Sequence, residues 1–283
     1  MQDARICQMI DTHHHFWRYN PTEYGWISDA MCAIRRDFLP ADLHAEILAA
    51  GVDSVISVQA RQCLAETKWL LDFASRYKFI SAVVGWVPLI DPKVDGLLTE
   101  LTAEPKLRSV RHVLHDEPDD NYMLRDDFNR GISVLARYDL AYDILIFARH
   151  LPQTITLVDR HPDQVFIIDH IAKPDIRAGK LEPWRTQLHE LARRPNVFCK
   201  LSGMVTEADW RSWTPATLAP YAQTVLECFG PDRLMIGSDW PVCLVACDYT
   251  RWIRTARELL GTLSAAEQHK IEQTTPLRAY HIR

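Results

Sequence analysis

Glycine is scarce in this sequence, which has only ten glycines among 283 residues. No glycine-rich segment follows the first apolar run, residues 6–10. Doubly wound nucleotide-binding folds cradle phosphates on such a segment, so its absence argues against them. The seven cysteines are scattered, odd in number and without a CxxC pair. This pattern favours a reduced protein with mostly buried thiols over a disulfide framework.

An excess of positive charge and long apolar runs are missing as well. A net charge of −5 gives no electrostatic basis for binding nucleic acid or an anionic membrane. No apolar run approaches the ~20 residues that span a bilayer, and residues 1–5 lack the apolar core of a signal peptide. We therefore expect a cytoplasmic globular protein that acts on a small molecule, and a homo-oligomer stays open.

Apolar segments rich in β-branched residues alternate with segments of helical periodicity along the whole chain. The predicted strands are residues 6–10, 52–59, 79–87, 107–114, 140–147, 164–170, 196–201 and 233–237. The predicted helices are residues 40–50, 66–77, 94–102, 126–138, 152–161, 180–194, 215–229, 249–260 and 265–273. Eight strands that each precede a helix predict an α/β fold, a single (β/α)₈ barrel over residues 1–283. An open doubly wound sheet is the alternative.

Three consecutive histidines follow the first predicted strand. Side chains of a strand alternate between its faces, so His13 and His15 share one face and His14 points away. Two imidazoles at this spacing form one edge of a metal or catalytic site. The alternative is a surface cluster or a tag remnant, but Phe16 and Trp17 follow at once, which is unlike a tag.

Active groups of such a barrel lie at the carboxyl ends of its strands, where two further candidates occur. His170 ends the sixth predicted strand, and Asp239 follows the eighth. Together with His13 and His15 they suit one divalent ion, Zn²⁺ or Mn²⁺, with an open position for water or substrate. Asp239 is then the natural general base. The alternatives are a structural core histidine at 170 and a turn-capping aspartate at 239.

Polar and aromatic side chains at the same strand ends are candidates for substrate binding. They are Trp26, Gln59, Trp86, Arg111, His112, Lys200 and Trp240. Indole rings suit a small oxygenated ring such as a sugar derivative, although large aromatics also simply roof a barrel. Lys200 is a cation within an apolar strand, so it is either buried against Asp143 or Asp239 or in contact with substrate. Residues 18–38 form a long loop, which is usually functional.

The motifs resemble one family in order along nearly the whole chain. They are Ile10-Asp11-Thr12-His13-His14-His15-Phe16-Trp17, Val110-Arg111-His112, Asp169-His170 with Lys173-Pro174, Cys199-Lys200-Leu201-Ser202-Gly203 and Gly237-Ser238-Asp239-Trp240-Pro241. This set is similar to the sugar lactonases of the amidohydrolase superfamily. The L-fuconolactonase group looks most similar, and L-rhamnonolactonase and 2-pyrone-4,6-dicarboxylate lactonase look related.

The resemblance implies a lactonase of L-fucose degradation that opens a sugar-acid lactone. It implies that His13, His15, His170 and Asp239 bind one divalent ion, Zn²⁺ foremost. It also implies that His15, His170 and Asp239 act in catalysis, Asp239 as base. Some lactonases of this branch work without tightly bound metal, their histidines polarising the carbonyl. The rival expectations are a lactonase for a dicarboxylate or sulfonated lactone, with Arg61, Arg111 and Arg149 as its cations, and a decarboxylase of the same superfamily.

Overall fold

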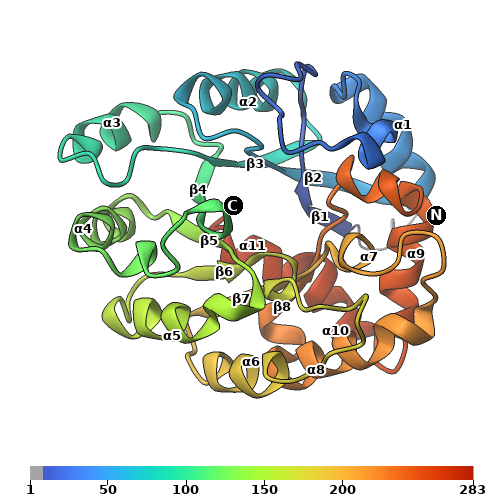
Figure 1. Cartoon of the computed structure of the whole chain (residues 1–283). Coiled ribbons are helices and arrows are strands. Elements are labelled where there is room, and N and C mark those ends of the chain that lie inside the picture. Colours follow the sequence, from blue (N-terminus) through green and yellow to red (C-terminus); the bar gives the residue numbers. More distant parts are fainter. Residues whose placement is uncertain (1–8, 283) are drawn as a thin grey trace, which may run out of the picture.

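The computed structural model describes residues 9–282 (Figure 1). Eight parallel strands hydrogen-bond to one another in chain order. They are β1 (Met9–His14), β2 (Val52–Val58), β3 (Ile80–Gly85), β4 (Leu107–Val113), β5 (Ala141–Leu145), β6 (Phe166–Ile168), β7 (Val197–Leu201) and β8 (Leu234–Ile236). Helices surround this ring of strands in Figure 1. The predicted (β/α)₈ barrel is confirmed.

The outer helices follow the predicted alternation. They are α1 (Pro40–Ala50), α2 (Leu64–Arg76), α3 (Val94–Leu101), α4 (Asp126–Leu135), α5 (Leu151–Arg160), α6 (Trp184–Ala192), α8 (Pro215–Arg233) and α9 (Tyr249–Leu259). The short helices are α7 (Met204–Glu207), α10 (Ala265–His269) and α11 (Thr275–Ala279). Helix α1 shows how sequence sets the limits: Pro40 is its first residue, the Asp42 carboxylate accepts the Leu39 N–H at 2.9 Å, and Gly51 ends it with φ 66°.

Two predicted strand boundaries are wrong at the places that matter most. The first strand runs from Met9 to His14 rather than over residues 6–10, of which 6–8 lie outside the described residues. His13 therefore sits inside the strand. The sixth strand ends at Ile168, two residues before His170. The predicted helix over residues 180–194 is also shorter and begins at Trp184.

Strands β1 and β8 meet largely through the segment that follows β8. The Thr12 hydroxyl donates to the Ile236 carbonyl at 2.8 Å. Beyond the end of β8, the Asp239 N–H donates to the His13 carbonyl and the His15 N–H donates to the Trp240 carbonyl, each at 2.7 Å. These bonds bring the ring of strands together and place Asp239 beside the two histidines of β1.

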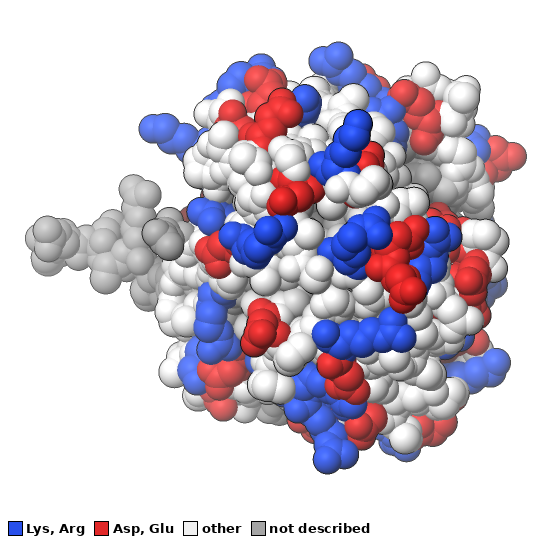
Figure 2. Space-filling model, turned by 90° about the vertical axis from the view of Figure 1, so that its left-hand side faces the viewer, with Lys and Arg blue, Asp and Glu red and all other residues white. Residues whose placement is uncertain are grey.

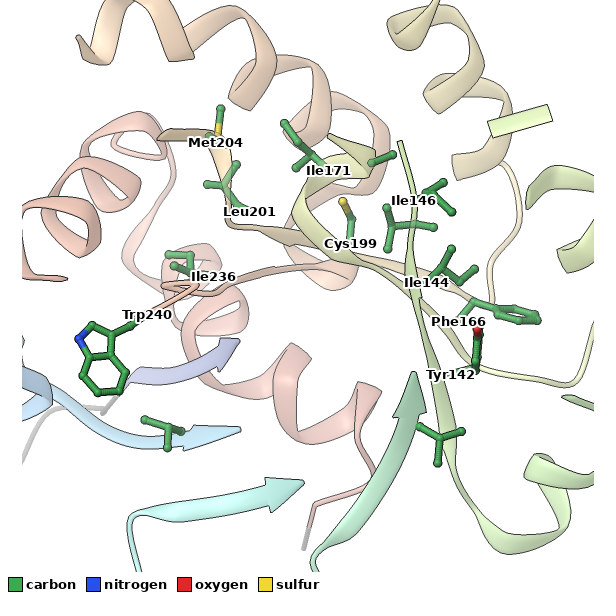
Figure 3. Close-up of a cluster of buried hydrophobic side chains, with 14 of the residues drawn as sticks. Tyr142, Ile144, Ile146, Phe166, Ile171, Cys199, Leu201, Met204, Ile236 and Trp240 are labelled. Carbon is green, nitrogen blue, oxygen red and sulfur yellow. The ribbon is translucent and has the colours of Figure 1, made fainter. Parts of the chain in front are cut away.

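Apolar side chains form two clusters, one on each side of the strands. The larger lies between strands and helices, and Figure 3 shows part of it around Tyr142, Ile144 and Phe166. The smaller gathers interior side chains of the barrel with two residues from the end of the described chain, Ala279 and Tyr280. Figure 1 shows α11 within the ring of strands. The chain thus fills its own barrel from inside.

The described residues contain no helix that is long and apolar enough to cross a membrane. Acidic and basic side chains are interspersed on the face in Figure 2, where no patch of one sign dominates.

Candidate active site

Three imidazoles and one carboxylate converge at the carboxyl end of the barrel. Nε2 of His13 lies 3.2 Å from Nε2 of His15. Oδ1 of Asp239 lies 3.4 Å from Nε2 of His15 and 3.9 Å from Nε2 of both His13 and His170. All four side chains are buried. The structure therefore brings together all four residues that the sequence predicts to be ligands.

Hydrogen bonds to the other ring nitrogens orient these imidazoles. Nδ1 of His15 lies 2.8 Å from the Val58 carbonyl, which only accepts, so this nitrogen carries a proton and Nε2 faces the site. Nδ1 of His170 lies 2.9 Å from the Ser202 hydroxyl. Each ring thus turns its Nε2 toward Asp239, an orientation that second-sphere bonds commonly impose on ligand histidines.

The segment that carries His170 has a left-handed backbone. Four consecutive residues, His170–Lys173, have φ values of 51°, 51°, 62° and 46°, and Asp239 has 57°. Such conformations cost L-residues about 1 kcal/mol or more each. The Trp184 indole N–H stabilises the turn by donating to the Ile171 carbonyl at 2.7 Å. Strain of this kind, held in place by packing, is common at functional sites.

Two glycines allow the close packing behind the imidazoles. A Cβ atom on Gly203 would lie 2.7 Å from ring atoms of His170, and one on Gly237 would lie 2.6 Å from Cβ of His13. Real Cβ atoms essentially never approach other atoms so closely. Gly203 also has φ +65°, which favours glycine. The backbone can approach the His170 ring and the Cβ of His13 this closely only because both positions lack side chains.

Burial and charge set the protonation states of the cluster. Burial lowers the pKa of His13 well below its usual value and that of His170 to about 4. Burial would raise the pKa of Asp239, but His170 and His15 outweigh it, and the net pKa lies below the usual value. Near pH 7 the imidazoles of His13 and His170 are therefore neutral and lie beside the ionised carboxylate of Asp239.

Three of these residues offer ligand atoms close enough together to hold a divalent ion. Bonds of about 2.1 Å to zinc imply about 3.4 Å between neighbouring ligand atoms in a tetrahedron. The Asp239–histidine distances and the His13–His15 distance are 3.2–3.9 Å. The group whose ligand atoms all lie within 4.8 Å of one another is His13, His170 and Asp239, without His15. Imidazole and carboxylate are ligands that Zn²⁺ accepts.

A buried network of four charges lies directly under His13. The Lys200 ammonium is 2.5 Å from Oδ2 of Asp143, 2.9 Å from Oδ1 of Asp169 and 3.1 Å from Nδ1 of His13. The Arg111 guanidinium is 2.9 Å from Oδ2 of Asp169 and 3.3 Å from Nε2 of His13. Lys200 is thus buried against Asp143, as one alternative held, but its second carboxylate is Asp169 rather than Asp239.

The cluster opens into a cleft of about 170 Å³. Of the predicted substrate-binding residues, Trp26 and Arg111 line this cleft. Trp26 belongs to the long first loop and is 42% exposed, which leaves its indole accessible. A residue of the first loop and a residue of β4 thus both line the cleft.

The other predicted substrate contacts do not line the cleft. Gln59 is buried and donates to the Arg111 carbonyl at 3.2 Å. The Trp86 indole contacts His112, whose Nε2 lies 2.6 Å from Glu117. Trp240 is only 1% exposed and packs against Phe16 and Phe38. Lys200 is fully buried, as described above. Position near a strand end does not decide which way a side chain points, and this explains the differences.

Two residues that sequence reasoning missed line the cleft, His115 and Lys173. Burial lowers the pKa of His115 to about 2, so its imidazole is neutral. The Lys173 ammonium lies 3.4 Å from the Glu207 carboxylate. Lys173 belongs to the motif Asp169-His170 with Lys173-Pro174, and this motif could have identified it. His115 follows β4 and belongs to no such motif.

Fold and site together define a (β/α)₈-barrel enzyme whose centre combines neutral imidazoles with an ionised carboxylate. The chain belongs to the amidohydrolase family, whose model matches residues 10–282.

Relatives with curated names include an L-fucono-1,5-lactonase of Burkholderia multivorans, which is 41% identical over 96% of this chain and 95% of its own. An L-rhamnono-gamma-lactonase of Scheffersomyces stipitis is 23% identical over 72% of this chain and 70% of its own. A crystal structure of a B. multivorans amidohydrolase with bound zinc has a TM-score of 0.92 and 40% identity, and the match covers 98% of this chain and 100% of that one. The predicted family is confirmed.

Proposed function

We propose that this protein hydrolyses a sugar-acid lactone, of the L-fucono-lactone kind, to the aldonate. The observation that carries the proposal is the cluster of His13, His15, His170 and Asp239 beside a cleft that Trp26 lines. The relative named L-fucono-1,5-lactonase, similar over almost the whole chain, supports the substrate class.

The charges around the cleft favour a neutral polyol over a dicarboxylate. Arg61 pairs with Glu23 at 2.5 Å, and Arg149 pairs with Asp120 at 3.3 Å. Arg111 alone of the three candidate arginines lines the cleft, and its guanidinium already pairs with Asp169. A substrate with two carboxylates would find no uncommitted arginine among these three.

In the proposed reaction the Asp239 carboxylate accepts a proton from the attacking water. The water oxygen bonds to the lactone carbonyl carbon, and the carbonyl oxygen takes up negative charge. That charge is stabilised by the positive potential of the site, to which Arg111 and Lys173 contribute. The bond from carbon to the ring oxygen then breaks, and Asp239 returns its proton to this leaving oxygen.

The ligands proposed for a metal are His13, His15, His170 and Asp239, with Zn²⁺ the first candidate. A divalent ion bound there supplies a Lewis acid for the carbonyl and lowers the pKa of water. The second-sphere bonds of His15 and His170 hold two of these ligands in place.

The test is a screen of aldonolactones with a pH indicator, because ring opening to an acid releases a proton. Elemental analysis of the same preparation identifies the metal. The matched control is Asp239→Asn, which keeps size and hydrogen bonding but removes the base. Turnover of no lactone, together with release of CO₂ from a benzoate-like acid, would replace the proposal with a decarboxylase.

A further inference from the structure

Tyr280 reaches the active-site network from the opposite end of the barrel. It follows α11, is fully buried, and packs among interior side chains such as Ile10 and Val84. Figure 1 shows α11 within the ring of strands. The Tyr280 hydroxyl donates to Oδ2 of Asp143 at 2.7 Å. A residue 267 positions after His13 in the chain thus lies just beneath the site.

Asp143 connects this hydroxyl to the imidazole. Its Oδ2 accepts from Tyr280 and from the Lys200 ammonium, and its Oδ1 accepts from the Ser109 hydroxyl at 2.6 Å. Lys200 in turn lies 3.1 Å from Nδ1 of His13. Every side chain of this path is 0% exposed. The path from phenol to imidazole therefore has two intermediates and is shielded from water.

The hydroxyl matters because the carboxylate is costly to bury. Burial raises the pKa of Asp143, and the charge of Lys200 together with the hydrogen bonds from Lys200 and Ser109 opposes that effect. Burial also holds the pKa of Tyr280 well above its usual value, so the phenol remains a donor. Lys200 has a flexible stem and two carboxylates within reach, at 2.5 and 2.9 Å. The two hydroxyl donors, Tyr280 and Ser109, fix the Asp143 carboxylate, which then holds the ammonium from one side while Asp169 contacts it from another.

We propose that Tyr280 is a positioning residue of the active site, which fixes Asp143 and, through Lys200, the imidazole of His13. The inference rests on the proposed function, because it treats His13 as an active-site group. It assigns the segment after α11 a part in catalysis besides filling the barrel. Small displacements of such supporting groups are costly, since a misplacement of about 1 Å can reduce turnover about 100-fold.

The test compares Tyr280→Phe with Tyr142→Phe. Each substitution removes one buried phenol oxygen and keeps the ring, but the Tyr142 hydroxyl takes no part in this network, and its ring lies by Phe166 on the helix side of β5 (Figure 3). We expect Tyr280→Phe to lower kcat about tenfold with KM within about twofold, and Tyr142→Phe to turn over lactone like the unaltered protein. Equal kcat in Tyr280→Phe and the unaltered protein would overturn the inference, and so would equal losses in both variants.

A double-mutant cycle separates positioning from general destabilisation. Asp143→Asn removes the charge that the Tyr280 hydroxyl contacts, so adding Tyr280→Phe should lower kcat no further. Independent, multiplying losses would overturn the inference. Should Tyr280→Phe not fold, Asp143→Asn carries the test: lower kcat at unchanged KM supports the path, and unchanged kcat removes it.

A readout without substrate keeps the inference distinct from the proposed function. In ¹⁵N-histidine spectra of the protein as purified, the His13 resonances are those lost in His13→Gln. They should shift in Tyr280→Phe and stay in place in Tyr142→Phe. If the unaltered protein opened no lactone, the proposed function would fail. The shift of the His13 resonances would then be the test of whether Tyr280 positions His13. Unshifted His13 resonances in Tyr280→Phe would overturn it.

Discussion

Gly203→Ala places a methyl group against the imidazole ring of His170, a candidate metal ligand of the active site. The new Cβ would lie 2.7 Å from two ring atoms of His170 and 2.9 Å from its Cβ. The φ of +65° costs an alanine about 1 kcal/mol relative to glycine, and overpacking adds about 1–3 kcal/mol. We expect stability to fall by about 3 kcal/mol. Turnover should fall about 100-fold or more, because the imidazole must shift.

Gly179→Ala is the matched control. Gly179 has nearly the same φ, +66°, but its Cβ would have no atom within 4 Å. This variant should lose only the backbone contribution of about 1 kcal/mol and keep its turnover. The difference between the two variants therefore isolates the contact with His170.

The assays are urea unfolding followed by circular dichroism and steady-state turnover of the lactone found in the screen. Equal stability losses in both alanine variants, with turnover preserved in Gly203→Ala, would refute the steric reasoning. A loss of stability in Gly203→Ala without loss of turnover would show that His170 tolerates displacement.

Three further predictions concern the base, the buried histidines and the aromatic residues. Asp239→Asn should lower kcat by about 10³-fold with little change in melting temperature, and near-normal turnover would exclude Asp239 as base. In chelator-treated protein the free energy of unfolding should rise as pH increases from about 4 to 6.5. The reason is that burial lowers the pKa of His170 to about 4, so the unfolded chain binds more protons in this window; a flat profile would contradict it. Trp240→Ala should cost about 3–5 kcal/mol in urea unfolding, whereas Trp26→Ala should mainly raise KM; the reverse pattern would overturn both assignments.

Much of the architecture could be predicted because the strands of a parallel sheet are buried on both faces and therefore occur in the sequence as short apolar runs. Runs such as residues 79–87 and 140–147 are apolar except for Ser81 and Asp143, and β3 and β5 fall within them. The rule that active groups lie at strand ends then selected His170 and Asp239, which the structure places beside His13 and His15.

The direction of individual side chains and the local backbone could not be predicted from the sequence pattern. Trp240 immediately follows Asp239 in the chain but points into an aromatic cluster around Phe38, while Asp239 points into the cleft. His14 points away from His13 and His15, as the alternation of strand side chains predicts, and is buried with Nε2 2.9 Å from the Ser57 hydroxyl. The left-handed turn at residues 170–173 contains no glycine, so nothing in the sequence indicates it.

The bonds that join β1 to the segment after β8 have a consequence for how activity appears during folding. Asp239 donates to the His13 carbonyl across 226 positions of sequence, and contacts between such distant segments form slowly because a long loop must close first. The same bonds align Asp239 with His13 and His15. A refolding chain is therefore expected to form helices and neighbouring strand pairs before it has a catalytic centre. Recovery of turnover then reports the pairing of β1 with the segment after β8 rather than the formation of secondary structure.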